Sequence, residues 1–181
     1  MILMNSKVTK TLLTYFFLHS DENLYINEMV RKFRLDKRNL AKKLKEFEKE
    51  GLFKSEKRGN QIYYSLNKRY ALYDEYRKIV LKTTGIESQL ENILKGIDGI
   101  KKAYILGSYA RNKMDSASDI DLLVIGSANT INVHKKLAGL QERIDREINL
   151  INMSEKEFEI KKKENDPFIK DVFKKKRIEI I

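Results

Sequence analysis

The first fifty residues repeat apolar side chains at the spacing of amphipathic helices. Three segments, residues 8–17, 26–33 and 37–50, each place apolar side chains three or four positions apart, so that one face of each predicted helix is apolar. Asn27 and Asp36 belong to the residue types that cap helix N-termini, and we expect them to cap the second and third helices. The pattern predicts three short helices around one core.

The spacing changes after the third segment. Gly51 suits the end of a helix, and residues 52–67 then alternate apolar and polar side chains, which is typical of strands. Arg58, Gly59 and Asn60 stand in the middle of this stretch, where glycine and asparagine allow the positive φ of a tight turn. The sequence therefore predicts a β-hairpin with a basic tip.

One more helix is predicted before Gly85, where the helical pattern of apolar residues breaks. It covers residues 68–82, and its apolar side either packs within one chain or joins two chains in a homodimer. That side consists of Leu72, Tyr73, Tyr76, Ile79 and Val80. We expect an N-terminal domain over residues 1–68, a linker helix over 69–84 and a C-terminal domain over 85–181.

The positive charge is concentrated in the N-terminal half. The net charge is +11, and residues 1–84 hold 19 Lys and Arg against 10 Asp and Glu, whereas residues 85–181 hold 18 against 16. A basic half of this kind indicates a polyanionic partner. The alternative is a lysine-rich surface that only keeps the protein in solution.

Three helices followed by a basic-tipped hairpin resemble the winged helix-turn-helix family. The resemblance implies double-stranded DNA as a partner, with the third helix in the major groove and the hairpin on the backbone or minor groove. Arginine and asparagine can read base edges, while lysines suit phosphates. The implied DNA-binding residues are Lys37, Arg38, Asn39, Lys42, Lys43, Arg58 and Asn60. A three-helix domain that binds other proteins is the alternative.

A second motif lies at residues 107–126, "GSYARNKMDSASDIDLLVIG". Gly107 and Ser108 follow a buried-type strand and are expected to open a short helix, whose free N–H groups suit a phosphate. Asp119 and Asp121 are expected to point to the same face of the next strand, because strand side chains alternate. Two such carboxylates beside a phosphate site would hold Mg²⁺.

This motif resembles the minimal branch of the DNA polymerase β superfamily of nucleotidyltransferases. The matching residues are Gly107-Ser108, Ala110-Arg111 and Ser118-Asp119-Ile120-Asp121, followed by "LLVIG". The resemblance covers residues 86–181 and implies a nucleoside triphosphate and Mg²⁺ as ligands. It implies that Asp119 and Asp121 hold the metal. It also implies a nucleotide site made by Gly107, Ser108, Arg111 and Ser118.

One position departs from the family pattern. Active members carry a third carboxylate on the following strand, and here "EINLIN" places Asn149 at that catalytic position. An amide carries no charge and is not a general base. Glu147 lies on the same face about 6.6 Å earlier. It would substitute for the missing carboxylate only if the strand shifted.

Three functions remain open from the sequence. One is a DNA-binding transcriptional regulator whose nucleotidyltransferase-like domain binds a nucleotide with reduced or absent activity. Another is an active enzyme that moves NMP from an NTP to a hydroxyl of a protein or small molecule. A third is a scaffold without a ligand, which the intact Gly107, Ser108, Asp119 and Asp121 disfavour.

The overall expectation is an α+β chain with a winged helix-turn-helix followed by a mixed α/β nucleotidyltransferase-fold domain. The sequence has no cysteine, so disulfides and thiolate metal sites are excluded. Only His19 and His134 are present, which argues against a histidine-rich metal site. No apolar run approaches the ~18 residues of a membrane span. We therefore expect no membrane contact and a cytoplasmic location.

Overall fold

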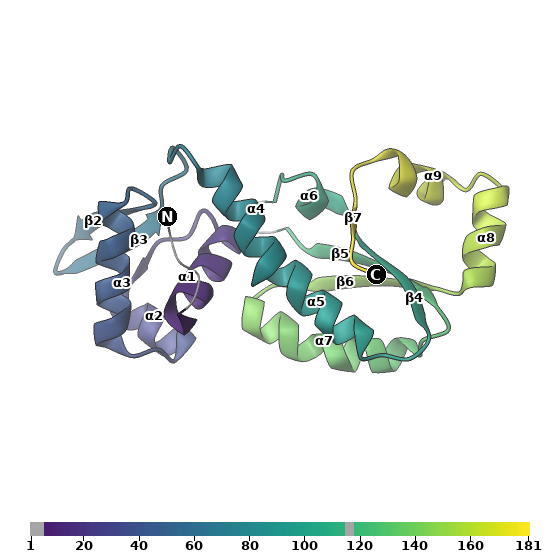
Figure 1. Ribbon diagram of the computed structural model, residues 1–181, viewed down its shortest axis with the longest axis horizontal. Helices are drawn as coiled ribbons and strands as arrows, with labels where there is room; N and C mark the ends of the chain where they lie inside the picture. Colours follow the sequence, from purple (N-terminus) through teal and green to yellow (C-terminus); the bar gives the residue numbers. More distant parts are fainter. Residues whose placement is uncertain (1–5, 115–117) are drawn as a thin grey trace. The chain divides into compact units, whose positions relative to one another are not determined.

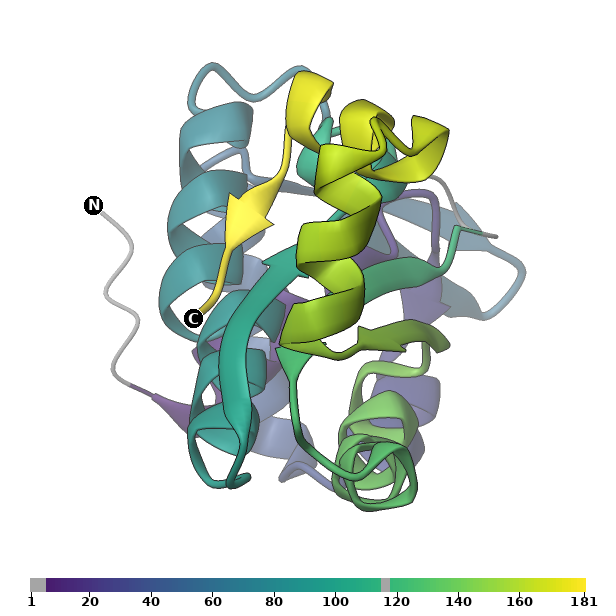
Figure 2. The same ribbon diagram turned by 90° about the vertical axis from the view of Figure 1, so that its right-hand side faces the viewer.

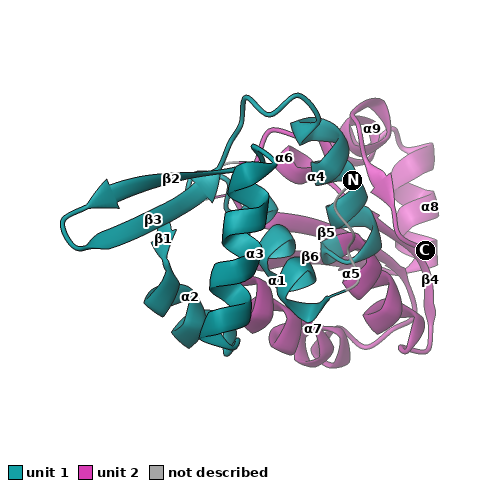
Figure 3. Ribbon diagram, turned by 60° about the vertical axis from the view of Figure 1, so that its left-hand side comes forward, with its two compact units in different colours: residues 1–86 teal, residues 87–181 magenta. Residues whose placement is uncertain are grey.

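The computed structural model describes residues 6–114 and 118–181 of the chain. The chain divides into two compact units, residues 1–86 and residues 87–181 (Figures 1 and 3). Each unit has its own buried core and is described by itself.

Unit 1 places a three-stranded antiparallel sheet beside a group of short helices. Its strands are ordered β1-β3-β2, and β2 and β3 form a hairpin that turns at Gly59 and Asn60. Gly59 has a φ of +58° there, as the turn requires. In chain order the elements are α1 (Lys7–Leu18), β1 (Leu24–Tyr25), α2 (Ile26–Phe33), α3 (Lys37–Lys49), β2 (Phe53–Arg58), β3 (Gln61–Leu66) and α4 (Tyr73–Thr83).

Two of the three helix-terminal residues expected in unit 1, Asp36 and Gly51, lie at helix ends in the structure. The Asp36 carboxylate accepts a hydrogen bond from the Asn39 backbone N–H at 2.9 Å and begins α3. Gly51, with a φ of +81°, follows the last turn of α3. The prediction of Asn27 as the cap of α2 was wrong. The cap is Tyr25, because β1 pairs with β3 up to this residue and the helix begins directly after it.

The core of unit 1 is built around α1. Leu12, Leu13 and Phe16 are completely buried. The ring of Phe53 packs edge-on against Phe16, with centroids 5.0 Å apart, and lies stacked with Phe47 of α3 at 5.5 Å. Aromatic side chains therefore join the helices to the sheet.

Helix α4 begins later than the sequence suggested, at Tyr73 instead of residue 68. Its apolar side is also divided. Val80 is buried, and the Tyr73 ring packs against Phe17 with centroids 5.4 Å apart, whereas Leu72 and Ile79 are about half exposed. Tyr73 and Val80 of the predicted stripe therefore pack within unit 1.

Unit 2 contains a four-stranded mixed sheet in the order β6-β5-β4-β7. Strands β4 and β5 are antiparallel, β5 and β6 are parallel, and β7 is an antiparallel edge strand beside β4. The parallel pair is connected by α7. The elements are α5 (Ile86–Lys95), β4 (Ile100–Ile105), α6 (Gly107–Ala110), β5 (Ile120–Gly126), α7 (Thr130–Ile144), β6 (Ile148–Met153), α8 (Glu155–Lys163), α9 (Pro167–Lys174) and β7 (Ile178–Glu179).

The C-terminal helices pack on one face of this sheet. Leu123 and Ile125 of β5 share a core cluster with Phe158 of α8 and with Ile169 and Val172 of α9. Figure 2 shows α8 crossing in front of the strands. Because side chains alternate along a strand, Asp121 lies on the same face of β5 as Leu123 and Ile125. The candidate site therefore lies on the face that α8 and α9 approach.

Ser154 and Asp166 cap these two helices. Their side chains accept hydrogen bonds from the backbone N–H groups of Glu157 and Ile169, each at 3.1 Å. Pro167 occupies the first turn of α9, where its missing N–H costs nothing. Within the described residues, no helix combines the length and the apolar character needed to cross a membrane.

Candidate nucleotide site

Asp121 and Asn149 lie directly opposite each other in the parallel pair of β5 and β6. The Asn149 side-chain amide donates a hydrogen bond to Asp121 Oδ1 at 3.2 Å. Asn149 is exposed, and Asp121 is half-buried. The register therefore puts an uncharged amide against the carboxylate that the sequence motif identifies.

Gly107 approaches Asp121 from the adjacent strand. The Leu106 backbone N–H donates to the Asp121 carbonyl at 2.8 Å, which brings the end of β4 against the start of β5. Gly107 has a φ of +66°, and a Cβ at this position would lie 2.0 Å from Asp121 Oδ2. Glycine is thus required both by the backbone conformation and by the space that the carboxylate occupies.

Asp119 is exposed and lies just before β5, which begins at Ile120. The preceding residue, Ser118, is held by Arg146, whose Nη1 donates to the Ser118 carbonyl at 2.6 Å. Arg146 was not among the residues predicted from the sequence, and it is only 7% exposed. The available signal was the alternation along "REINLINM", where residue 146 shares the inward-facing parity of Ile148.

Ser108 lies within the short helix α6, and Arg111 is the residue directly after it. Ser108 is half-buried, and its backbone carbonyl accepts a hydrogen bond from the Lys113 N–H at 2.9 Å, while Arg111 is exposed. The helix predicted at this place is present but has only four residues. A single turn sums few peptide dipoles, so its contribution to phosphate binding is smaller than the sequence suggested.

A cavity of about 230 Å³ lies between the strand ends and α9. It brings together three of the predicted site residues with a second wall that comes from the C-terminal segment. The lining residues are Leu106, Gly107, Arg111, Asp121, Ile151, Phe168, Asp171, Val172, Lys175 and Lys176. The hydrophobic pattern of the sequence gave no sign of this second wall.

The donor atoms at this place suit a hard cation that arrives with a phosphate. Mg²⁺ is usually bound by one or two carboxylates together with substrate phosphates and water. Asp121 supplies a carboxylate at the cavity, and Asp119 lies just before the same strand without lining the cavity. The missing Cβ of Gly107 leaves the room that the Asp121 carboxylate occupies. In the described part of the chain, no cluster of three or more Asp, Glu, His or Cys side chains forms a cage from protein alone.

A larger cavity, of about 570 Å³, lies in unit 1. Its lining mixes Ser, Asn, Lys and Arg side chains and includes Lys68 and Asp21, which form an ion pair. The smaller cavity is the better candidate for chemistry because it contains a half-buried carboxylate beside a glycine turn.

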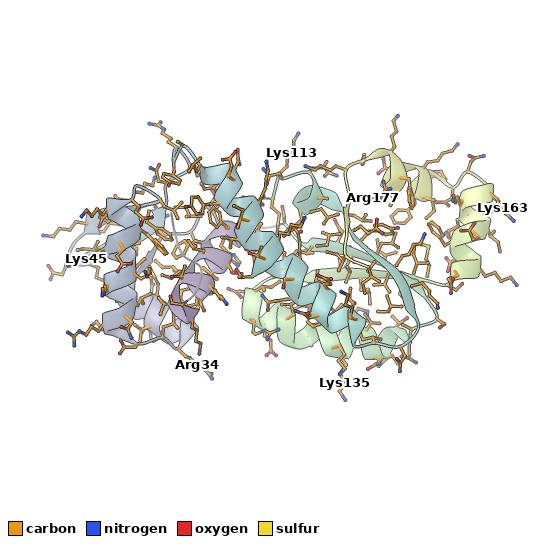
Figure 4. All side chains as sticks on the ribbon, in the orientation of Figure 1. Arg34, Lys45, Lys113, Lys135, Lys163 and Arg177 are labelled. Atoms are coloured by element: carbon orange, nitrogen blue, oxygen red, sulfur yellow. The ribbon has the colours of Figure 1, made fainter. Side chains whose placement is uncertain are left out.

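The DNA-binding residues predicted on α3 differ in their exposure and in their side-chain partners. Lys37, Arg38, Asn39 and Lys42 are all exposed. Lys43 instead forms an ion pair with Glu46, and its ammonium lies 5.7 Å from the centre of the Phe47 ring. Lys45 projects from the same helix (Figure 4).

The hairpin residues are similarly divided. Asn60 is exposed at the turn. Arg58 donates to Glu56 at 2.6 Å, and its guanidinium lies 5.0 Å from the centre of the Tyr63 ring. This hydrogen bond and the nearby positive charge lower the pKa of the Glu56 carboxyl. Arg58 is therefore oriented along the hairpin, with part of its charge already neutralised.

The glycine turn and the acidic strand define a nucleotidyltransferase-type domain in unit 2. The family model described as "Nucleotidyltransferase domain" matches residues 87–180, and the chain belongs to this family. No protein among curated sequences matches the chain.

Three solved structures are similar to parts of the chain. A toxin–antitoxin with AMP-PNP shares 23% identity at a TM-score of 0.33, and the match covers 36% of this chain and 56% of that one. A mutant of the toxin–antitoxin MntA–HpeT shares 14% identity at a TM-score of 0.40, covering 53% and 73%. A protein from Sulfolobus solfataricus named as a nucleotidyltransferase shares 22% at 0.29, covering 41% and 68%.

Proposed function

We propose that unit 2 binds a nucleoside triphosphate with Mg²⁺ and that unit 1 binds double-stranded DNA. The chain would then act as a DNA-binding regulator with a nucleotidyltransferase domain of reduced or absent activity. The observation that carries this proposal is the Asn149 amide in register with Asp121 and hydrogen-bonded to it.

Nucleotide binding is supported by the cavity beside the glycine turn. Gly107 lets a phosphate approach the backbone, Arg111 supplies positive charge, and Asp121 supplies a carboxylate at the cavity wall. Asp119 adds a second carboxylate at the start of the same strand. Bound Mg²⁺ would neutralise these carboxylates and polarise a phosphoryl oxygen.

Reduced transfer follows from the side chain at residue 149. Nucleotidyl transfer needs the attacking hydroxyl to lose its proton to a nearby base. The Asn149 amide cannot accept that proton, and its N–H group already donates to Asp121. The site is thus built to hold a nucleotide more readily than to cleave it.

DNA binding is supported by unit 1. Its elements follow the order α1-β1-α2-α3-β2-β3, which the resemblance to a winged helix-turn-helix implies, and α3 presents Lys37, Arg38 and Lys42 to solvent. Positive charge is concentrated in this half of the chain. Such a surface favours phosphate contacts through the release of counterions. The half-exposed Leu72, which precedes α4, and Ile79 on α4 are candidates for homodimer contacts.

Isothermal titration of the full chain with each NTP, with and without Mg²⁺, tests the nucleotide site. Wild type should bind at least one NTP in a Mg²⁺-dependent way, and Asp121→Asn should lose most of that affinity. DNA binding should survive the Asp121→Asn change, because the proposed DNA contacts lie in unit 1. Failure of wild type to bind any NTP would contradict the proposal.

An active nucleotidyltransferase is the second candidate, and Glu147 is the observation that favours it. Glu147 and Asn149 are exposed and alternate with the buried Arg146 and Ile148, so they share a face of the chain. Transfer of label from an α-³²P NTP by wild type, abolished by Glu147→Gln, would establish Glu147 as the third carboxylate. With that result, the proposed function would be that of an active nucleotidyltransferase and not that of a regulator with reduced activity.

A further inference from the structure

We propose that α9 and the residues after it form the second wall of the nucleotide site, with Lys175 and Lys176 binding the polyphosphate. This inference rests on the proposed nucleotide binding and adds the part of the ligand that the C-terminal segment recognises. The ligand class is a nucleoside carrying two or three phosphates.

One face of α9 is directed at the cavity. Phe168, Asp171, Val172 and Lys175 line it, and their spacing of three and four residues is that of one helical face. Val172 is 6% exposed and anchors this face in the core cluster of the sheet. The polar members of the face, Asp171 and Lys175, are therefore held at the cavity by packing.

Charge at the cavity favours an anion once a cation is bound. Arg111, Lys175 and Lys176 are cationic, and Asp121 and Asp171 are the acidic residues among the lining side chains. A cation bound at Asp121 would offset that carboxylate and leave the positive side chains in excess. Phosphate oxygens are strong acceptors for such donors, and charge-assisted hydrogen bonds are the strong ones.

Lys175 is already positioned before a ligand arrives. Its Nζ lies 2.8 Å from Asp171 Oδ1 one helical turn away, and both side chains are about half exposed. An exposed pair of this kind is weak, so a phosphate can compete with Asp171 for the ammonium. Asp171 thus keeps the Lys175 ammonium at the cavity only weakly, and a phosphate that binds Lys175 displaces it.

The neighbouring basic residues either contact other side chains and backbone groups or lie outside the cavity. The Arg177 guanidinium, labelled in Figure 4, lies 4.3 Å from the centre of the Phe173 ring, and Nη1 donates to the Phe173 carbonyl at 3.1 Å. Lys170 and Lys174 are exposed on α9 and do not line the cavity. They provide matched controls, because they have the same charge on the same helix.

The backbone on both sides of these lysines is fixed. Asp166 caps the start of α9, and β7 pairs with β4 just after Arg177. The Ile180 backbone N–H donates to the Ala103 carbonyl at 2.8 Å. Lys175 and Lys176 therefore lie in a short connection between two anchored elements, which limits the entropy lost on binding a ligand.

The test compares lysine variants of the full chain by isothermal titration with ATP, adenosine and inorganic tripolyphosphate, all with Mg²⁺. The double variant Lys175→Ala/Lys176→Ala should bind ATP about tenfold or more weakly than wild type. Lys170→Ala/Lys174→Ala should bind like wild type. Tripolyphosphate should lose affinity in parallel with ATP, and any binding of adenosine should be unaffected.

Two further arms separate the possible failures. Asp171→Asn should strengthen ATP binding, because it releases Lys175 and removes a negative charge, and weaker binding would contradict the inference. If wild type binds ATP and Asp121→Asn abolishes it while both double variants equal wild type, the C-terminal wall is refuted and the nucleotide site stands. If wild type binds no NTP, the proposed function fails, and this inference fails with it.

Discussion

The Asn149 amide lies in register with Asp121 and donates to Asp121 Oδ1 at 3.2 Å. The hydrogen bond satisfies one oxygen of a carboxylate that would otherwise depend on a cation or water. It also means that residue 149 stabilises the site without a metal. A carboxylate in its place would create a like-charge pair that a bound cation would relieve.

Asn149→Asp should therefore destabilise unit 2 in the absence of divalent metal, by about 1–2 kcal/mol, and Mg²⁺ or Mn²⁺ should restore much of the loss. Thermal unfolding with and without each metal measures both effects. Asn149→Ser removes the amide without adding charge and should show no metal-dependent recovery. Equal behaviour of the two variants would contradict the like-charge argument.

Gly107→Ala should damage the site. Alanine disfavours a positive φ, and its Cβ would overlap Asp121 Oδ2, so we expect a cost of about 2–4 kcal/mol and loss of nucleotide binding. Chemical denaturation measures the stability. Gly139→Ala is the control, since a Cβ there meets nothing within 4 Å and α7 should gain about 0.5–1 kcal/mol.

Lysines on α3 should differ in their effect on DNA affinity. Lys42→Ala should weaken binding to all sequences and lower the salt slope by about 0.9, because a free ammonium releases a counterion on meeting phosphate. Lys43→Ala should matter less, since Glu46 already neutralises that side chain. Fluorescence anisotropy at several salt concentrations gives both slopes. A larger effect from Lys43 would contradict the assigned orientation of α3.

Arg38→Ala should instead relax sequence preference, at a cost of about 1–3 kcal/mol for the preferred site if Arg38 reads a base edge. Selection of bound sequences from a random duplex pool compares wild type with the variant. Uniform weakening across the pool, without altered preference, would place Arg38 on the phosphate backbone.

Alkaline pH should destabilise unit 1 through Tyr73. Burial raises the pKa of this phenol above its usual value near 10, with Asp74 raising it further and a hydrogen bond to Ser20 and nearby positive charges opposing the shift. The folded state then binds the proton more tightly than the unfolded state, so stability is retained below pH ~10 and falls above it. Tyr73→Phe should flatten that fall in urea unfolding measured across this range. An unchanged slope would exclude Tyr73 as its source.

Local rules account for much of the fold. Helical spacing and the Asp36 cap predicted α3 well, and the turn at Gly59 followed from the residue types that accept a positive φ. Tyr25 as a helix cap was not predictable in this way. It depends on a strand pairing with Tyr63, a residue nearly forty positions away.

The candidate site likewise has one feature that could be predicted from the sequence and one that could not. The register of Asp121 with Asn149 was predictable, since two adjacent parallel strands with alternating side chains allow few alignments. The wall made by α9 was not, because Lys175 lines the same cavity as Gly107 only through the packing of Val172 and the pairing of β7 with β4. Such tertiary contacts leave no periodic mark in the sequence.

The parallel register of β5 and β6 also has a genetic consequence. Codons for asparagine and aspartate differ at one base, so a single point mutation at residue 149 would place a third carboxylate beside Asp121 without moving the backbone. Lineages carrying this fold could therefore exchange a site with an amide at residue 149 for a site with a third carboxylate, or the reverse, in one mutational step. Selection on the charge at one position would decide which form persists.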